Sequence, residues 1–257
     1  FLGGAGSLNL PAGSQAAVWG SYYLYLTGGM TINNAGAFTL SGAGFLSMYP
    51  GTAINNSGSF VLQDGRFLFD ASYGRSPTSA FNNTGTFTAS RGGGGFYSAF
   101  NNAGSIEVRD DSVLQLEGGG TSSGSFRGTA SSSLYFSGGH RLTPTSSVTS
   151  PGLVTLQGAL IEGAYNATGK NVMYSADITG PMAPTMTELA VYGNGVYFHH
   201  SPVTTPTLRL VDGALFTDAA LTVTDRFDWP GGFLGGAGSL NLPAGSQAAV
   251  WGSYYLY

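Results

Sequence analysis

The sequence predicts an all-β chain wound as a parallel β-solenoid, and two repeats of different length carry this prediction. A short pattern with a glycine turn recurs at intervals of about 20 residues, and alternating apolar residues follow each copy. In addition, residues 1–25 recur letter for letter as residues 233–257, an offset of 233 − 1 = 232. One turn per short period is typical of a solenoid in which each repeat forms one coil.

Four copies of the short repeat place two asparagines before a glycine, and a fifth copy keeps only the glycine and the apolar residue. Its glycines stand at positions 36, 58, 85, 104 and 124, so the steps between them are 22, 27, 19 and 20. Asparagine and glycine enter the left-handed backbone region at low cost, which predicts a sharp turn in every coil. We expect the asparagine amides to form a hydrogen-bonded ladder from coil to coil. The ladder residues are Asn33, Asn34, Asn55, Asn56, Asn82, Asn83, Asn101 and Asn102.

After each turn, apolar and other residues alternate with period two, which predicts a strand. The apolar side chains should project into one shared interior and stack on their counterparts in the next coil. The predicted core stack consists of Phe38, Phe60, Phe87, Ile106 and Phe126. The remaining sequence contains short strand patterns separated by Gly, Pro, Asp and Asn, without a sustained helical period. An antiparallel sandwich is the alternative, but it does not require similar turns at a coil-length interval.

The long repeat predicts the organisation of the chain. We expect residues 1–257 to form one continuous solenoid, with residues 1–232 as one unit and 233–257 as the start of the next, identical unit. At about 20 residues per coil, a unit holds about ten to twelve coils. The two identical segments should then occupy equivalent places in adjacent units. A chain engineered by copying one end onto the other is the alternative explanation.

Composition excludes several classes of function. Charged residues make up 9% of the chain, against about 25% in an ordinary domain, and the net charge is −4. This balance gives no support to a nucleic-acid partner, and no apolar run reaches the length of a membrane span. The chain has no cysteine, which excludes disulfides and thiolate metal sites.

Few residues in the sequence suggest a catalytic, metal or phosphate-binding site. The adjacent carboxylates Asp110 and Asp111 fit a turn better than a catalytic pair, because neighbouring side chains point apart. The pair His199 and His200 has no acidic residue at ligand spacing, so we interpret it as a solvated turn. The run Gly92–Gly95 lacks the helix of a phosphate loop and is interpreted as a flexible bulge. The sequence therefore predicts no catalytic residue, metal site or cofactor.

Two further patterns concern the surface. Asn166 begins an Asn-x-Thr sequence and is the best candidate for glycosylation, because the corresponding Asn55 and Asn82 lie in the ladder. Tyrosine is too frequent for a narrow interior, and exposed tyrosine rows with little charge are typical of contact surfaces. Incidental surface aromatics are the alternative. The candidate contact surface consists of Tyr22, Tyr23, Tyr25, Tyr49 and Tyr97.

The repeats also carry a resemblance. The segments FNNTGTFTAS (81–90), FNNAGSIEV (100–108) and FDWPGGFLGGAGSLNLPAG (227–245) resemble repeats of large bacterial surface and secreted proteins. The likeness is broadly to filamentous-haemagglutinin and autotransporter-passenger repeats. It implies a right-handed parallel β-helix that is exported to the cell surface or the extracellular space. It is informative for architecture and weak for activity.

These observations lead to three hypotheses of function. The first is a non-enzymatic structural module of an extracellular or cell-surface fibre or sheath, whose partners are neighbouring copies of the same unit. The second is an adhesin stalk or a surface module that binds glycans. The third is a polysaccharide lyase or hydrolase. Near-identity of repeats favours the first, because a lattice needs equivalent contacts in every unit whereas catalysis needs one site.

Overall fold

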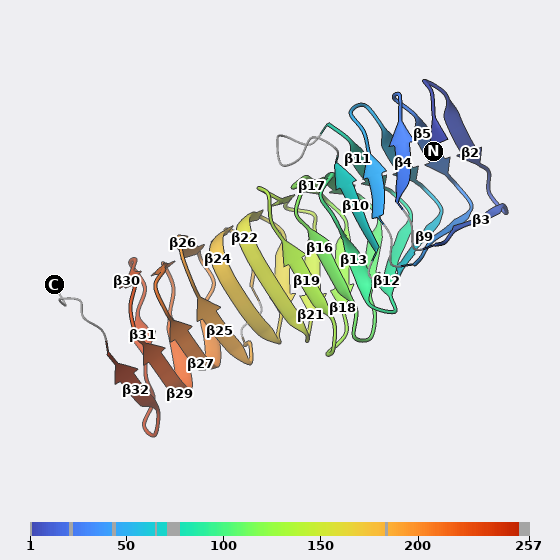
Figure 1. Cartoon of the computed structure of the whole chain (residues 1–257). Coiled ribbons are helices and arrows are strands. Elements are labelled where there is room, and N and C mark those ends of the chain that lie inside the picture. Colours follow the sequence, from blue (N-terminus) through green and yellow to red (C-terminus); the bar gives the residue numbers. More distant parts are fainter. Residues whose placement is uncertain are drawn as a thin grey trace.

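The chain forms an elongated stack of parallel coils, about 12 in number. The computed structural model describes residues 2–20, 23–42, 45–64, 66–70, 78–182 and 185–251. These residues include no helix, and every strand pairing between them is parallel. The strands β2 (Ser7–Leu10) and β32 (Gln247–Val250) lie at opposite ends of the stack (Figure 1). The predicted parallel β-solenoid is confirmed.

Each coil carries strands on three faces, and each strand pairs with its counterpart about one coil away. We name the faces in the order in which the chain meets them. The first face contains β1 (Leu2–Gly3), β4 (Leu24–Thr27), β7 (Phe45–Met48), β10 (Arg66–Asp70), β13 (Gly93–Phe96), β16 (Val113–Leu116), β19 (Ser133–Phe136), β25 (Glu188–Val191) and β32 (Gln247–Val250).

The second face lies one corner further along the chain. It contains β2 (Ser7–Leu10), β5 (Thr31–Asn34), β8 (Ala53–Asn56), β11 (Ala80–Asn83), β14 (Ala99–Asn102), β17 (Thr121–Ser122), β20 (Arg141–Leu142), β26 (Gly195–Phe198), β28 (Ala214–Thr217) and β30 (Phe233–Gly235).

The third face closes the coil. It contains β3 (Gln15–Val18), β6 (Ala37–Leu40), β9 (Ser59–Gln63), β12 (Thr86–Ser90), β15 (Ser105–Val108), β18 (Ser125–Gly128), β21 (Ser147–Ser150), β23 (Ala164–Ala167) and β31 (Leu240–Asn241).

Four longer strands round a corner and so belong to two faces. The strands β22 (Leu153–Ile161) and β24 (Lys170–Ile178) run from the first face to the second. The strands β27 (Val203–Leu210) and β29 (Leu221–Trp229) run from the third face to the first of the next coil. Their ladders contain register shifts at the bends.

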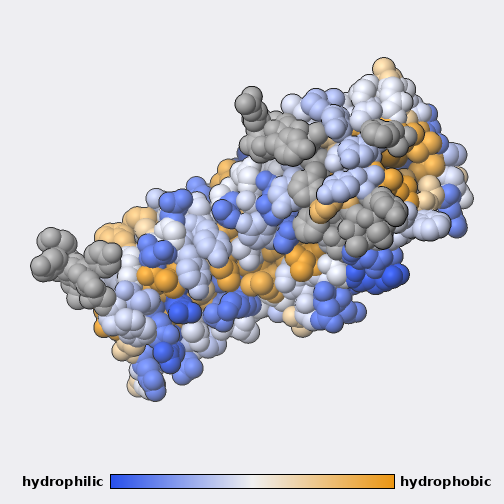
Figure 2. All heavy atoms as spheres, viewed as in Figure 1, coloured by the Kyte–Doolittle hydropathy of each residue, from blue (hydrophilic) through white to orange (hydrophobic). Residues whose placement is uncertain are grey.

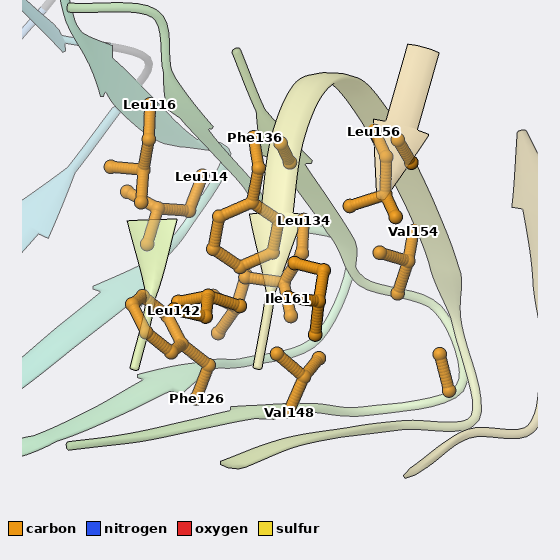
Figure 3. Close-up of a cluster of buried hydrophobic side chains, with 14 of the residues drawn as sticks. Leu114, Leu116, Phe126, Leu134, Phe136, Leu142, Val148, Val154, Leu156 and Ile161 are labelled. Carbon is orange, nitrogen blue, oxygen red and sulfur yellow. The ribbon is translucent and has the colours of Figure 1, made fainter. Parts of the chain in front are cut away.

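The three faces enclose one apolar core that extends along the stack. Alternate residues of most strands are buried, as period-two patterning requires. Figure 3 shows this interior in the middle coils, where side chains from all three faces point toward one another. Phe136 of the first face, Leu142 of the second and Phe126 of the third each expose 0% of their surface. Each buried side chain of this size contributes roughly 1.5–3 kcal/mol.

The glycine run is a buried strand, so its interpretation as a flexible bulge is wrong. Gly93, Gly94 and Gly95 belong to β13, and all three are buried. A Cβ atom on Gly93 would lie 2.1 Å from the carbonyl oxygen of Val113 in the next coil. The glycines therefore allow two neighbouring coils to approach more closely than side chains would permit.

The identical segments do not occupy equivalent places, which corrects a second expectation. Leu2 lies on the first face, where it pairs with Leu26 of β4. Its copy Leu234 lies on the second face, where it pairs with Leu215 of β28. The length of chain between the copies is therefore not a whole number of coils.

Candidate functional site

The paired asparagines form two separate rows at the corner between the second and third faces. The second member of each pair points inward and exposes about 1% of its surface. Nδ2 of Asn34 donates to Oδ1 of Asn56 (2.7 Å), Asn56 donates to Asn83 (2.6 Å) and Asn83 donates to Asn102 (2.8 Å). Nδ2 of Asn34 also donates to the backbone carbonyl of Ser59, and Nδ2 of Asn56 to that of Thr86, so these buried N–H groups are paired.

The first member of each pair points outward and forms the outer row. Nδ2 of Asn55 donates to Oδ1 of Asn33 (2.9 Å), Asn82 donates to Asn55 (2.9 Å) and Asn101 donates to Asn82 (2.9 Å). The outer amides donate toward the N-terminus of the chain and the inner ones toward the C-terminus. The two rows of amide dipoles therefore run in opposite directions.

The sequence pattern missed one member of the outer row. Asn33 donates to Oδ1 of Asn9 (2.8 Å), although Asn9 is followed by Leu10 and Pro11 and lacks the paired-asparagine motif. The strand register could have identified it, because Asn9 aligns with Asn33. An open groove of about 510 Å³ runs beside this row and is lined by Asn9, Leu10, Pro11, Asn33, Asn34, Ala35, Asn55, Asn56, Ser57, Asn82 and Thr84.

The residues assigned to the core stack are buried and aligned across the third face. The rings of Phe38 and Phe60 stack with centroids 5.1 Å apart, and those of Phe60 and Phe87 with centroids 5.6 Å apart. Ile106 and Phe126 continue the row in register. Parallel register places like residues beside one another, which lets the rings stack face to face.

The inner polar column continues past the asparagines and ends at a buried histidine. Ser122 aligns with Asn102, and its Oγ lies 3.0 Å from Nε2 of His140. His140 exposes 0% of its surface and contacts the ring of Phe136 at a centroid distance of 5.5 Å. Burial lowers the pKa of His140 to about 4, and a backbone hydrogen bond at Gly119 opposes this shift. No motif around His140 in the sequence indicates this role.

Three of the five predicted contact tyrosines lie together. The rings of Tyr23 and Tyr25 have centroids 6.4 Å apart, and those of Tyr25 and Tyr49 are 6.3 Å apart. Tyr23 is 61% exposed. Tyr97 follows β13 as Tyr49 follows β7, so both line the corner after the first face. Tyr22 lies outside the described residues.

Further tyrosines lie at the corner after the first face in later coils. Tyr174 and Tyr192 stack with ring centroids 5.5 Å apart, and each follows the first-face part of its coil. We call Tyr23, Tyr25, Tyr49, Tyr97, Tyr174 and Tyr192 the tyrosine ridge. Figure 2 shows that the face in view mixes apolar and weakly polar residues, with strongly hydrophilic residues in scattered groups. Such a surface suits contact with another uncharged surface.

His199 has two carboxylate neighbours that its sequence position does not show. Its Nε2 lies 3.2 Å from Oδ1 of Asp177, and its Nδ1 lies 2.9 Å from Oδ2 of Asp218. The three residues come from successive coils, which is why sequence spacing missed them. His200 is exposed beside it in a left-handed conformation (φ 65°).

Three further polar residues have local surroundings that do not form a site. Asp111 adopts a left-handed conformation (φ 53°) in the exposed turn after β15. Asp228 is largely buried in β29 and accepts bonds from Nε of Arg226 (2.8 Å). The side chain of Asn166 is exposed on the third face between the buried Tyr165 and Ala167.

Clusters that suggest metal chemistry are absent from the part of the chain that the structure describes. There, no group of three or more His, Cys, Asp or Glu residues is arranged to hold a metal ion. Within the same residues, the structure contains no helix that is both long and apolar enough to cross a membrane.

Comparison with known proteins identified no relative. No protein-family model matched the sequence. No curated protein matched it either. No solved structure matched the fold.

Proposed function

We propose that the chain is a structural module of a β-solenoid fibre or sheath outside the cell or on its surface. The observation that carries the proposal is the continuity of like side chains from coil to coil. Two amide rows and one aromatic stack each pass through several coils, with every member in contact with the next. A solenoid stabilised by nearest-neighbour contacts can be extended by adding coils.

The charged side chains support the same function, because many of them join neighbouring coils. Arg141 Nε lies 2.8 Å from Oε2 of Glu162, and Lys170 Nζ lies 2.9 Å from Oε1 of Glu188. In both ion pairs the residues belong to adjacent strands of one ladder or to its corner. Ion pairs on the surface are individually weak. Their position between coils therefore supports the alignment of neighbouring coils, and we expect them to add little to the free energy of unfolding.

A chain of two units tests the proposal. It consists of residues 1–232 followed by residues 1–257, and we would image it beside the single chain by electron microscopy. We expect one unbroken rod, longer than the single chain by about 54 Å, because each added coil contributes about 4.8 Å. Two separate bodies joined by a linker would contradict the fibre module.

The groove beside the outer amide row favours a second candidate, an adhesive module that binds neutral glycans. Each outer amide uses one N–H and one oxygen lone pair in the row, which leaves a donor and an acceptor for hydroxyl groups. Screening of immobilised neutral glycans would test it, with the Asn55→Ala variant as the matched control. Binding that is equal in both proteins would exclude this groove as the glycan site.

A further inference from the structure

The two copies of the repeated end segment fold alike but lie on different faces. In the first copy, β1 lies on the first face, β2 on the second and β3 on the third. In the second copy, the corresponding strands β30, β31 and β32 lie on the second, third and first faces. All three strands are thus displaced by one face in the same direction.

The local structure of the segment survives this displacement. Gly4 and its copy Gly236 have φ angles of 112° and 109°, and Gly13 and its copy Gly245 have φ angles of 83° and 96°. Leu8 and its copy Leu240 both pack against the core. The turn glycines therefore keep their conformation on a different face, although the copies of Leu10 and Val18 in the last coil, Leu242 and Val250, are 42% and 54% exposed.

The unequal length of the coils explains the displacement. Along the first face, Phe67 pairs with Gly95, which is 95 − 67 = 28 positions further along the chain. Val154 pairs with Asn171, which is only 171 − 154 = 17 positions further. Because coils differ in length, the long repeat need not close on the face where it began. Counting strand pairs from β1, the copy begins eleven coils and one further face later.

We infer that successive identical units of a tandem fibre are rotated by one face of the coil, about a third of a turn, in addition to any twist of the stack. This inference rests on the proposed function, because it requires identical units joined in tandem. Three units restore the starting face after about 34 coils, which corresponds to about 160 Å at a coil spacing of about 4.8 Å.

The rotation determines how the fibre meets its neighbours. A feature fixed to one side of a unit, such as the tyrosine ridge on the first face and the corner after it, appears on three sides of the fibre in turn. Exposed Tyr23 and Tyr49 would then contact copies of the same solenoid around the whole fibre. This arrangement suits a bundle of parallel fibres, whereas units without rotation would offer a one-sided seam.

Engineered disulfides test the displacement in the single chain, which has no natural cysteine. Thr222 pairs with Asn241 on the third face, and Ala214 pairs with Phe233 on the second. The double variants Thr222→Cys/Asn241→Cys and Ala214→Cys/Phe233→Cys should therefore form intramolecular disulfides under mild oxidation, because neighbouring strands lie within disulfide range. Gel mobility with and without reductant measures the product.

A matched variant detects the alternative arrangement. If the copy occupied the same faces as residues 1–25, Asn241 would lie beside Phe216 of β28, so Phe216→Cys/Asn241→Cys would form the disulfide instead. We expect little or no disulfide in this variant. Its efficient oxidation, or failure of both displaced pairs to oxidise, would overturn the inference.

A chain of three units tests the rotation itself. Asn166→Cys in every unit provides an exposed label site on the third face, to which a bulky thiol-reactive label is attached for electron microscopy. We expect one rod with labels on three sides. Labels on a single side of a continuous rod would overturn the rotation and leave the proposed fibre intact, whereas a chain of separate bodies would overturn the fibre.

Discussion

The N-terminal coils and the later coils pair the polar groups of their corners in different ways. In four N-terminal coils, the second to the fifth, the corner between the second and third faces contains buried asparagines that bond to one another across coils. In the later coils, long strands such as β22 and β24 carry backbone pairing around a different corner, from the first face to the second. At the corner between the third and first faces, the buried Asn171 accepts from Tyr165 and donates to carbonyls of Ala167 and Gly169, all nearby in sequence.

This difference separates two requirements of a solenoid. Buried polar groups at corners must be paired, and either a ladder between coils or a local network can pair them. The apolar stack, by contrast, continues through both regions, from Phe38 to Phe227. Continuity of the core is therefore the general requirement, and the amide ladder is one local way to satisfy a corner.

The largest expected effect tests whether the core is equally important in both regions. Phe60→Ala removes a ring between Phe38 and Phe87 and should cost about 3–5 kcal/mol of unfolding free energy. Leu208→Ala, in the later region, should cost about 2–5 kcal/mol. Chemical denaturation of both variants measures these values. A cost below about 1 kcal/mol at Leu208 would show that the later region depends on something other than its core.

The boundary between the regions should respond to acid through His140. Its pKa of about 4 in the folded protein lies below the unfolded value of about 6.5. The unfolded state therefore binds more protons between these values, so stability is present above pH 6.5 and falls as the pH drops toward 4. The loss should reach about 3 kcal/mol.

Denaturation between pH 7 and pH 4 measures this loss, with His140→Gln as the control. The variant removes the imidazole and retains a neutral side chain that can bond to Ser122. We expect a shallower dependence on pH in the variant than in the original protein. Equal dependence in the two proteins would show that His140 is protonated without cost.

Removing an asparagine from the ladder between coils should disturb more coils than removing one from the local network. Asn56→Ala removes the acceptor of one Asn34 hydrogen bond and leaves the buried Oδ1 of Asn83 without its donor, and it should cost about 2–3 kcal/mol. Hydrogen exchange should increase in the coils on both sides. For Asn171→Ala we expect faster exchange mainly around Tyr165 and its own coil, and an equally wide effect would contradict this distinction.

The smallest effect is expected in the outer row. Asn55→Ala also breaks two side-chain bonds, but its neighbours Asn33 and Asn82 are partly exposed and can bond to water. The cost should be below about 1 kcal/mol by chemical denaturation. A cost equal to that of Asn56→Ala would show that the outer row also contributes to folding.

Much of the fold could be predicted because its signals are local. The period-two pattern around Phe60 and Phe87 depends on neighbours in sequence, and the structure has it. The chain also turns at the Asn-Asn-x-Gly motif, but the expected left-handed backbone is wrong, because the asparagines lie in strands and the turn glycines have no positive φ. A Cβ atom on Gly58 would lie 2.2 Å from the carbonyl oxygen of Gly36, so the close approach of neighbouring coils requires glycine there. The later coils provide weaker signals, because their long strands bend without a repeated motif. The tyrosine ridge was predicted in part, since Tyr49 and Tyr97 follow strands that sequence patterning could locate.

The parallel coil, the turn positions and the residues that face inward can all be derived from the amino-acid sequence, because they follow from backbone preference and alternation within a few residues. Only the tertiary structure decided which residues of neighbouring coils contact one another and which face each segment occupies. There His199 meets Asp177 and Asp218, the glycines of β13 are buried, and identical segments lie on different faces. These outcomes depend on the lengths of all the coils that separate the residues in the sequence, and a pattern of a few residues does not determine those lengths.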